Sequence, residues 1–164
     1  PFSVAAWVKP AAGSPSCFIA ATAPAASKGW GLFYGGSDAT ATYSYPGRGT
    51  LAFHFAADDT NMLHCYTQPG AVSDSRWSHV AATYTGTSLS SGIALFVNGV
   101  QHTTPCAPHT LSASTATASQ LTIGARPGAS PTPFAGNIAD VAVFRSALSP
   151  ERIANHVVAA TDAP

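Results

Sequence analysis

The stretch that most constrains this chain runs from Arg76 to Val100, RWSHVAATYTGTSLSSGIALFVNGV. Residues of two kinds alternate over 77–84 and again over 93–97, which is the period of a strand with two distinct faces. Asn98-Gly99 then stands between apolar flanks. This dipeptide favours a type I′ turn, because that turn needs a positive φ at both central residues. The stretch therefore predicts two antiparallel strands and a tight hairpin into a third.

Short alternating or apolar runs, bounded by Gly, Pro, Asn and Ser, recur along the rest of the chain, and each is predicted to be a strand. These runs are 2–8, 17–21, 30–34, 51–55, 62–67, 100–104, 121–125 and 138–144. Ser149, Pro150 and Glu151 are typical of a helix start, and the helix is predicted to end near Ala160. Because about ten strands occur without βαβ alternation, we predict an all-β fold with two packed antiparallel sheets and one short C-terminal helix.

Length and charge narrow the classes of function. The 164 residues predict a single domain, 1–164. Only 9% of residues are charged, with seven basic and seven acidic, so nothing favours nucleic acid or an anionic membrane as partner. Apolar runs fall far short of the ~20 residues that span a bilayer, and no membrane insertion is expected. The abundance of Ala, Ser, Thr, Gly and Pro favours an extracellular or cell-surface setting, and the start at Pro1 is expected to reflect a removed signal peptide or a piece of a longer protein.

Several segments resemble one family, in that family's order. They are W-x-H-V-A-x-T-Y followed by L-F-V-N-G in the central stretch, FSVAAWVKP at 2–10, LTIG at 121–124, and GNIADVAVF at 136–144 followed by ALS. Together they resemble the laminin-G-like (concanavalin A-like) lectin/glucanase jelly roll over nearly the whole chain. The resemblance implies jelly-roll topology for the two sheets, and it implies calcium as a cofactor.

Carboxylates are too few for the enzymes of similar folds. Glycoside hydrolases need two facing carboxylates, whereas this chain has one Glu, Glu151, at the predicted helix start. The E-x-D-x-x-E strand of the glucanase members is absent, as are G-x-S-x-G and H-E-x-x-H. We predict a non-enzymatic recognition or adhesion module that binds a glycan or an extracellular protein and belongs to a larger chain or assembly. A purely structural building block is the alternative, and a glycoside hydrolase is a weaker one.

Aromatic residues are the candidates for binding sugar, because rings stack on sugar faces while nearby polar groups fix the orientation. Trp7 and Trp77 fill the strand positions of the family, so they are predicted to lie in the core, and replacing Trp77 by alanine is predicted to destabilise the domain. His79 shares a strand face with Trp77 and either bonds a neighbouring strand or contacts a ligand. The candidate ligand-binding residues are Trp30, Tyr34, Tyr43, Tyr45, Tyr66 and His79.

Two places could supply metal ligands. Asp58, Asp59 and Asn61 form a turn that could give calcium two or three of its six to eight oxygens, or form an Asx-type turn without metal. His54 and His64 could meet across a sheet as metal ligands.

The family's I-D-[DE]-V segment is altered here. It reads Ile138-Ala139-Asp140-Val141, so its first acidic position is Ala139. Alternation predicts that Ala139 faces the same way as Val141, with Asp140 on the opposite face. Asp140 remains a candidate calcium ligand, but a family-type site is expected to lack a carboxylate.

Three cysteines fit no metal-ligand spacing. We predict a Cys65–Cys106 disulfide, since the strands that flank the central hairpin could bring both to one end of the sandwich. Cys17 is left out of this pair, although its pairing with either partner, or three reduced thiols, remain alternatives. The segments 110–119 and 129–133 are rich in Ser, Thr and Pro, which is typical of O-glycosylated loops.

Overall fold

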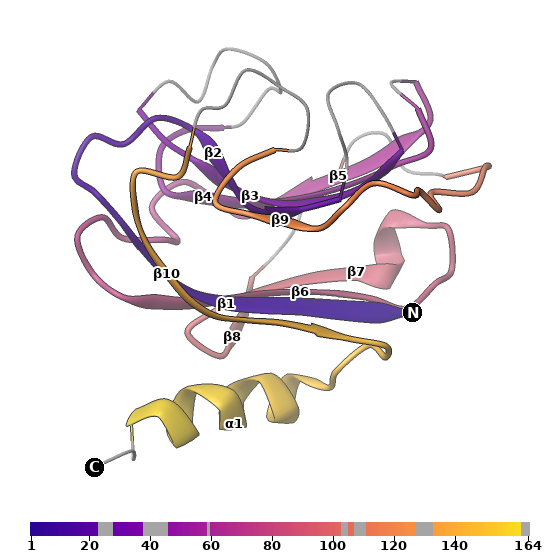
Figure 1. Ribbon diagram of the computed structural model, residues 1–164. Helices are drawn as coiled ribbons and strands as arrows, with labels where there is room; N and C mark the ends of the chain where they lie inside the picture. The colour runs from indigo at the N-terminus through magenta and orange to yellow at the C-terminus, as the bar shows by residue number, and fades with distance from the viewer. Residues whose placement is uncertain are drawn as a thin grey trace.

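The computed structural model describes residues 1–22, 28–37, 46–58, 60–102, 105–106, 111–126 and 133–161 (Figure 1). Two antiparallel sheets face each other, and one helix lies against the outer face of one sheet. The predicted all-β jelly-roll sandwich with a short C-terminal helix is confirmed. Its elements are β1 (Phe2–Pro10), β2 (Cys17–Ala21), β3 (Gly29–Gly35), β4 (Thr50–Ala56), β5 (Met62–Tyr66), β6 (Ser78–Tyr84), a 3₁₀ turn η1 (Ser90–Gly92), β7 (Ile93–Val97), β8 (Val100–His102), β9 (Thr122–Ile123), β10 (Gly136–Phe144) and α1 (Pro150–Thr161).

Each sheet has five strands among the described residues. The first, here called sheet A, has the order β10-β1-β6-β7-β8, and the second, sheet B, has the order β5-β4-β3-β2-β9. Figure 1 shows sheet B above sheet A, with α1 beneath sheet A. Sheet A therefore has an inner face toward sheet B and an outer face toward α1.

The core lies between the sheets, and a smaller apolar cluster lies under the helix. Fully buried residues from both sheets, among them Val4, Leu95 and Leu32, fill the space between the sheets. On the outer face of sheet A, Phe96 and neighbouring alanines pack against Ile153 of α1. Because both faces of sheet A are covered there, every residue of β6 is buried rather than every second one.

The predicted hairpin is confirmed, and it contacts both β6 and the helix. Asn98 and Gly99 have φ values of 51° and 79°, as a type I′ turn requires. The Asn98 side-chain oxygen accepts a hydrogen bond of 2.9 Å from the backbone N–H of His79. A Cβ on Gly99 would lie 3.1 Å from the Cα of Ala154 in α1. The turn thus joins sheet A to the helix.

The predicted disulfide between Cys65 and Cys106 is present, with Cα atoms 4.1 Å apart. Cys106 forms an antiparallel bridge with Cys65, and the Tyr66 N–H donates to the Pro105 carbonyl at 3.2 Å. Cys17 is buried and takes no part in the disulfide. The chain after β8 therefore returns beside β5, which is the neighbouring placement that the pairing needs.

The predicted helix start at Ser149 is confirmed. The Ser149 hydroxyl caps α1 by accepting a hydrogen bond of 3.3 Å from the Arg152 N–H.

No helix in the described part of the chain is long and apolar enough to cross a bilayer. Of the two Ser/Thr-rich segments, 111–119 and 133 are described and lie outside the strands, while the remaining positions are outside the described residues. O-glycosylation stays a prediction.

A bulge interrupts the pairing of β10 with β1. Ala5 pairs with Ala142 but Trp7 pairs with Ala139, so Asp140 and Val141 together face one residue of β1. Val141 packs against the core, whereas Ala139 lines the outer surface. The prediction that these two residues share a face is wrong, because strict alternation fails where a strand carries an extra residue.

Candidate functional site

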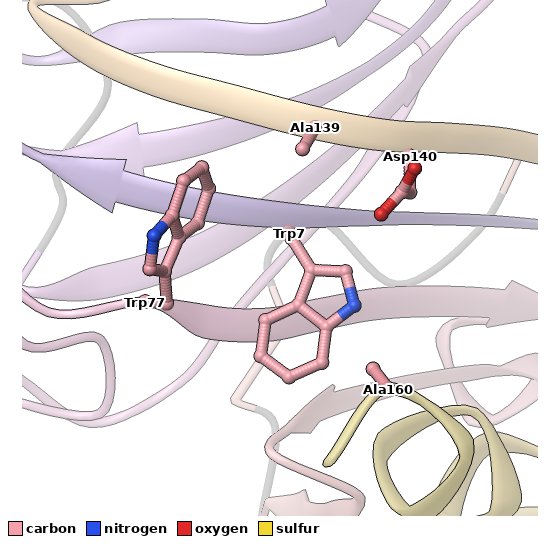
Figure 2. Close-up of a pocket in the computed structure, with 5 residues that line it drawn as sticks. All are labelled: Trp7, Trp77, Ala139, Asp140 and Ala160. Atoms are coloured by element: carbon pink, nitrogen blue, oxygen red, sulfur yellow. The ribbon is translucent and has the colours of Figure 1, made fainter. Parts of the chain in front are cut away.

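A pocket opens on the outer face of sheet A, beside the last turn of α1. Its volume is about 360 Å³. Figure 2 shows two indole rings, a carboxylate and two methyl groups around one space. The described residues that line it are Trp7, Trp77, Ala139, Asp140 and Ala160. They come from β1, the segment before β6, β10 and α1, so the pocket depends on the assembled fold.

The two tryptophans of the pocket were predicted to lie in the core, and that prediction is wrong. Trp7 is half-buried and lies on the outer side of β1 between its register partners His79 and Ala139. Trp77 precedes β6 and is 45% exposed. The family positions are correctly matched, but they belong to the outer face of sheet A. The helix covers that face where Ile153 packs against Phe96, and the pocket with the two tryptophans is open beside its last turn.

Asp140 reaches the pocket because of the bulge. Its φ is +50°, in the left-handed region that few residues other than glycine adopt, although Asp and Asn tolerate it better than most. In this conformation Ala139 and Asp140 both line the pocket, while Ile138 and Val141 pack against the core. Sparsely populated backbone conformations gather at functional sites. The strained residue here also carries the carboxylate of the pocket.

His79 lies beside Trp7 and is only 3% exposed. Its ring is edge-on to the Trp7 indole, with ring centroids 5.4 Å apart, and its centroid lies 5.9 Å from that of the His156 ring of α1. Burial lowers the pKa of His79 to about 4, with a further contribution from the charge of His156. The Nδ1 atom of His79 has no hydrogen-bond partner among the described residues. At neutral pH the ring is therefore uncharged and supports Trp7 from the side.

The other aromatic residues that were predicted to bind a ligand lie away from this pocket or outside the described residues. Trp30 of sheet B points into the sandwich, with its ring 5.7 Å from Phe2 and 6.5 Å from Phe53. Tyr34 is fully buried and donates its hydroxyl to Asp74, so it has no surface to offer a ligand. Tyr66 lies on the outer face of sheet B beside His64. Tyr43 and Tyr45 are outside the described residues.

Of the predicted calcium ligands that the structure describes, Asp58 and Asn61 share one turn, while Asp140 lies in the other sheet. Asp58 Oδ1 accepts hydrogen bonds from the Thr60 N–H, the Thr60 hydroxyl and the Asn61 N–H, at 2.8, 2.8 and 2.9 Å, which is an Asx-type turn. The Asn61 side chain bonds Ser112, Asp140 lines the pocket of sheet A, and Asp59 is outside the described residues. The described side chains do not fit a family-type calcium site.

His54 and His64 do meet across sheet B as neighbours in register, with ring centroids 6.3 Å apart. Burial lowers their pKa values to about 3 and about 4, and for His54 the charges of His64 and Arg126 add to the effect. No group of three or more His, Cys, Asp or Glu side chains placed to hold a metal occurs in the described part of the chain. A two-histidine pair without a third such ligand does not make a zinc site of the usual kind.

The sequence does carry a signal for the two tryptophans of the pocket. Alternation in β1 puts Trp7 opposite Val4 and Val8, and alternation before β6 puts Trp77 opposite Val80. Since the valines are the core residues, the two tryptophans belong to the other face. The bulge that adds Asp140 to them leaves no comparable signal in the sequence.

Solved structures of known proteins share this fold. The sialidase carbohydrate-binding module CBM40 of Ruminococcus gnavus, bound to α2,3 sialyllactose, is 20% identical with a TM-score of 0.68, and the match covers 94% of this chain and 81% of that one. The leech intramolecular trans-sialidase is 18% identical with a TM-score of 0.70, covering 96% of this chain and 23% of that one. Domain 4 of an extracellular arabinanase of Geobacillus stearothermophilus, in complex with arabinotriose, is 16% identical with a TM-score of 0.59, covering 94% of this chain and 65% of that one.

At these identities the likeness shows the fold alone. No curated protein matches the chain in sequence. The model of one family, by contrast, matches residues 1–154, which is nearly the whole sandwich and the start of α1. This agrees with the resemblance seen in the strand motifs, and the chain belongs to the concanavalin A-like lectin/glucanases superfamily.

Proposed function

We propose that this chain is a non-catalytic carbohydrate-binding domain whose ligand occupies the pocket of Trp7, Trp77 and Asp140. The observation that carries the proposal is the meeting of two indole rings and a carboxylate around one open space. Indole faces pack against the C–H faces of sugar rings, and a carboxylate accepts hydrogen bonds from sugar hydroxyls. The volume of about 360 Å³ falls at the lower end of the range of roughly 300 to 1,000 Å³ for small-molecule sites, which suits one or two sugar residues.

Similar folds support the same class of ligand. The structures of this fold described above include one with sialyllactose and one with arabinotriose. A structure from Bacteroides ovatus, 18% identical, is described as a putative carbohydrate-binding protein. One fold hosts many sites, so the proposal rests on the pocket of this chain and takes only added weight from these likenesses.

A single carboxylate among the described lining residues of the pocket favours binding over catalysis. Glycoside hydrolysis in most families uses two carboxyl groups roughly 5 to 10 Å apart across the scissile bond. Among the described lining residues of the pocket, Asp140 is the one carboxylate. A sugar held there meets an acceptor and two rings, without the acid and base pair that would cleave it.

The proposed setting is extracellular or cell-surface, with residues 1–164 as a single domain of a larger chain or assembly. The Cys65–Cys106 disulfide favours this setting, since disulfides persist in oxidising compartments. Adhesion to a glycosylated partner would follow from sugar binding in that location. A purely structural building block would leave the tryptophans of the pocket without a ligand.

The proposal is tested by a glycan array followed by calorimetric titration of the best ligand against wild type and Trp77→Ala. We expect Trp77→Ala to weaken binding at least about fivefold, taking as a guide the roughly 1 to 3 kcal/mol that stacking of a nucleic-acid base on one aromatic ring contributes. Leu121→Ala is the matched control, since Leu121 is also 45% exposed but lies next to β9 in the other sheet. Binding that both variants retain equally, or an array without any ligand, would refute the proposal.

A further inference from the structure

Two independent features place negative charge at the pocket. Asp140 is the one charged side chain among its described lining residues. Ala160 lies in the last turn of α1, where backbone carbonyls lack partners within the helix and carry the negative end of the helix dipole. The last turn of α1 has no basic residue to offset this end. The Asp140 carboxylate and the negative end of α1 therefore both border the pocket.

The two indole rings also favour a positively charged group in the pocket. The face of a tryptophan ring carries the negative part of its quadrupole and attracts a cation placed over it, by about 0.5 to 1 kcal/mol at exposed sites. Trp7 and Trp77 both border the pocket that Asp140 borders (Figure 2). Rings and carboxylate thus favour the same kind of group, a positively charged donor of hydrogen bonds.

Basic residues lie near the pocket without lining it. Lys9 is two residues beyond Trp7 on β1, and Arg76 precedes Trp77 with its side chain exposed. Neither belongs to the residues around the pocket. Asp140 is also exposed and screened by water and salt, but it lines the pocket, so its distance to a bound group is the shortest of the three charges.

Resting on the proposed function, we infer that the pocket prefers a sugar that carries a protonated amine, takes neutral sugars less tightly, and disfavours acidic sugars. The ammonium group would donate to the Asp140 carboxylate and lie against an indole face, while the sugar ring packs on the other indole. A carboxylate-bearing sugar would instead face Asp140 and the carbonyl end of α1 with the same sign of charge. This preference differs from that of the similar module solved with sialyllactose, an acidic sugar.

The test uses three sugars of one ring type and different charge, the methyl glycosides of glucosamine, glucose and glucuronic acid, at about pH 6.5, where amines of ordinary pKa are protonated. Binding is followed in NMR titrations by the indole N–H signals of Trp7 and Trp77. We expect glucosamine to bind most tightly and glucuronic acid least, with about fivefold between neighbours in the series. That factor corresponds to two unit charges about 4 Å apart in water.

Asp140→Asn is the decisive variant. Asparagine has nearly the same shape and tolerates the left-handed backbone, so the change removes charge and keeps the bulge. We expect it to weaken glucosamine about fivefold more than it weakens glucose, which loses only the charge on the acceptor of its hydroxyls, and to improve glucuronic acid. Glu151→Gln is the control, because it removes the same charge from the other end of α1, roughly 14 Å away along the helix, and should leave the order unchanged.

The outcomes separate the two proposals. If none of the three sugars shifts the indole signals and a glycan array finds no ligand, the proposed function fails, and this inference fails with it. If sugars bind but the three show equal affinities, or if the order survives in Asp140→Asn, the charge preference is wrong while the proposed function stands. Tightest binding of glucuronic acid would overturn the inference as well.

Discussion

The three tryptophans of the chain differ in what their rings touch. Trp30 packs in the sandwich against Phe2 and Phe53. Trp7 is half-buried beside His79, and Trp77 is 45% exposed at the rim of the pocket. Because the free energy lost on truncation follows the apolar area buried and the cavity left behind, these positions should contribute unequally to stability.

The destabilisation expected for Trp77→Ala from its motif position is wrong in its premise, because Trp77 is exposed. We now predict that Trp77→Ala lowers the free energy of unfolding by less than about 1 kcal/mol, whereas Trp30→Ala lowers it by about 3 kcal/mol. The reason is that the Trp77 ring already contacts water in the folded state, while removing Trp30 empties part of the core edge. Urea denaturation of both variants measures the two values. Equal losses would mean that Trp77 packs far more tightly than its exposure indicates.

Gly99 carries two constraints at one position. Its φ of 79° disfavours any side chain, and a Cβ there would approach the Cα of Ala154 to 3.1 Å. We predict that Gly99→Ala costs about 1 to 2 kcal/mol for the backbone, and more for the displaced helix. Gly70→Ala is the matched control, because Gly70 has a φ of 78° but nothing within 4 Å of an added Cβ. Thermal unfolding that shifts equally in both variants would show that the hairpin does not press on α1.

At the scale of elements, the disulfide ties the chain after β8 to an edge strand. β5 is the last strand of sheet B, so it has a hydrogen-bonded strand neighbour on one side. Cys106 and Pro105 lie along its other side. The disulfide holds this short pairing in place, which the few backbone hydrogen bonds would not do alone.

We predict that replacing Cys65 and Cys106 together by serine lowers the free energy of unfolding by about 4 kcal/mol, the chain-entropy value for a loop closed across 41 residues. Denaturation of the double variant, compared with oxidised and reduced wild type, measures this. Cys17→Ala serves as the control, since it removes a buried thiol and leaves the disulfide intact. A denaturation midpoint that reduction does not move would contradict the prediction.

The whole molecule should lose stability in mild acid. Burial lowers the pKa of His54 to about 3 and those of His64 and His79 to about 4, against an ordinary value of 6.5. Below pH 6.5 the unfolded chain therefore binds protons that the folded chain does not, and stability falls as the pH falls from 6.5 toward 4.

Each histidine contributes a slope of up to about 1.4 kcal/mol per pH unit in that window. We predict that unfolding free energies, measured by denaturant at pH 7.5, 6.5, 5.5 and 4.5, change little in the first step and fall steadily in the next two. Most carboxylates titrate below this range, so the loss reports the histidines. Constant stability from pH 7.5 to pH 4.5 would show that the histidines are accessible to protons in the folded state.

Much of the fold could be predicted from the sequence because its signals are local. The turn at Asn98-Gly99, the strand at 17–21 and the helix start at Ser149 each depend on a few adjacent residues. The site is different, since which face of a strand is covered depends on distant elements. Trp77 fills a core position of the family motif, and alternation assigns it to the outer face of sheet A, but that it is 45% exposed there depends on which parts of this face the rest of the chain covers.

The bulge at Asp140 also bears on how such a site is gained or lost in evolution. β10 is an edge strand of sheet A, so an extra residue in it alters the pairing with β1 alone. A deletion of one residue at this point would restore regular alternation and withdraw the carboxylate, while Ile138 and Val141 kept their places in the core. Related domains can therefore differ in whether they carry this acidic wall through a single codon, with the sandwich itself unchanged.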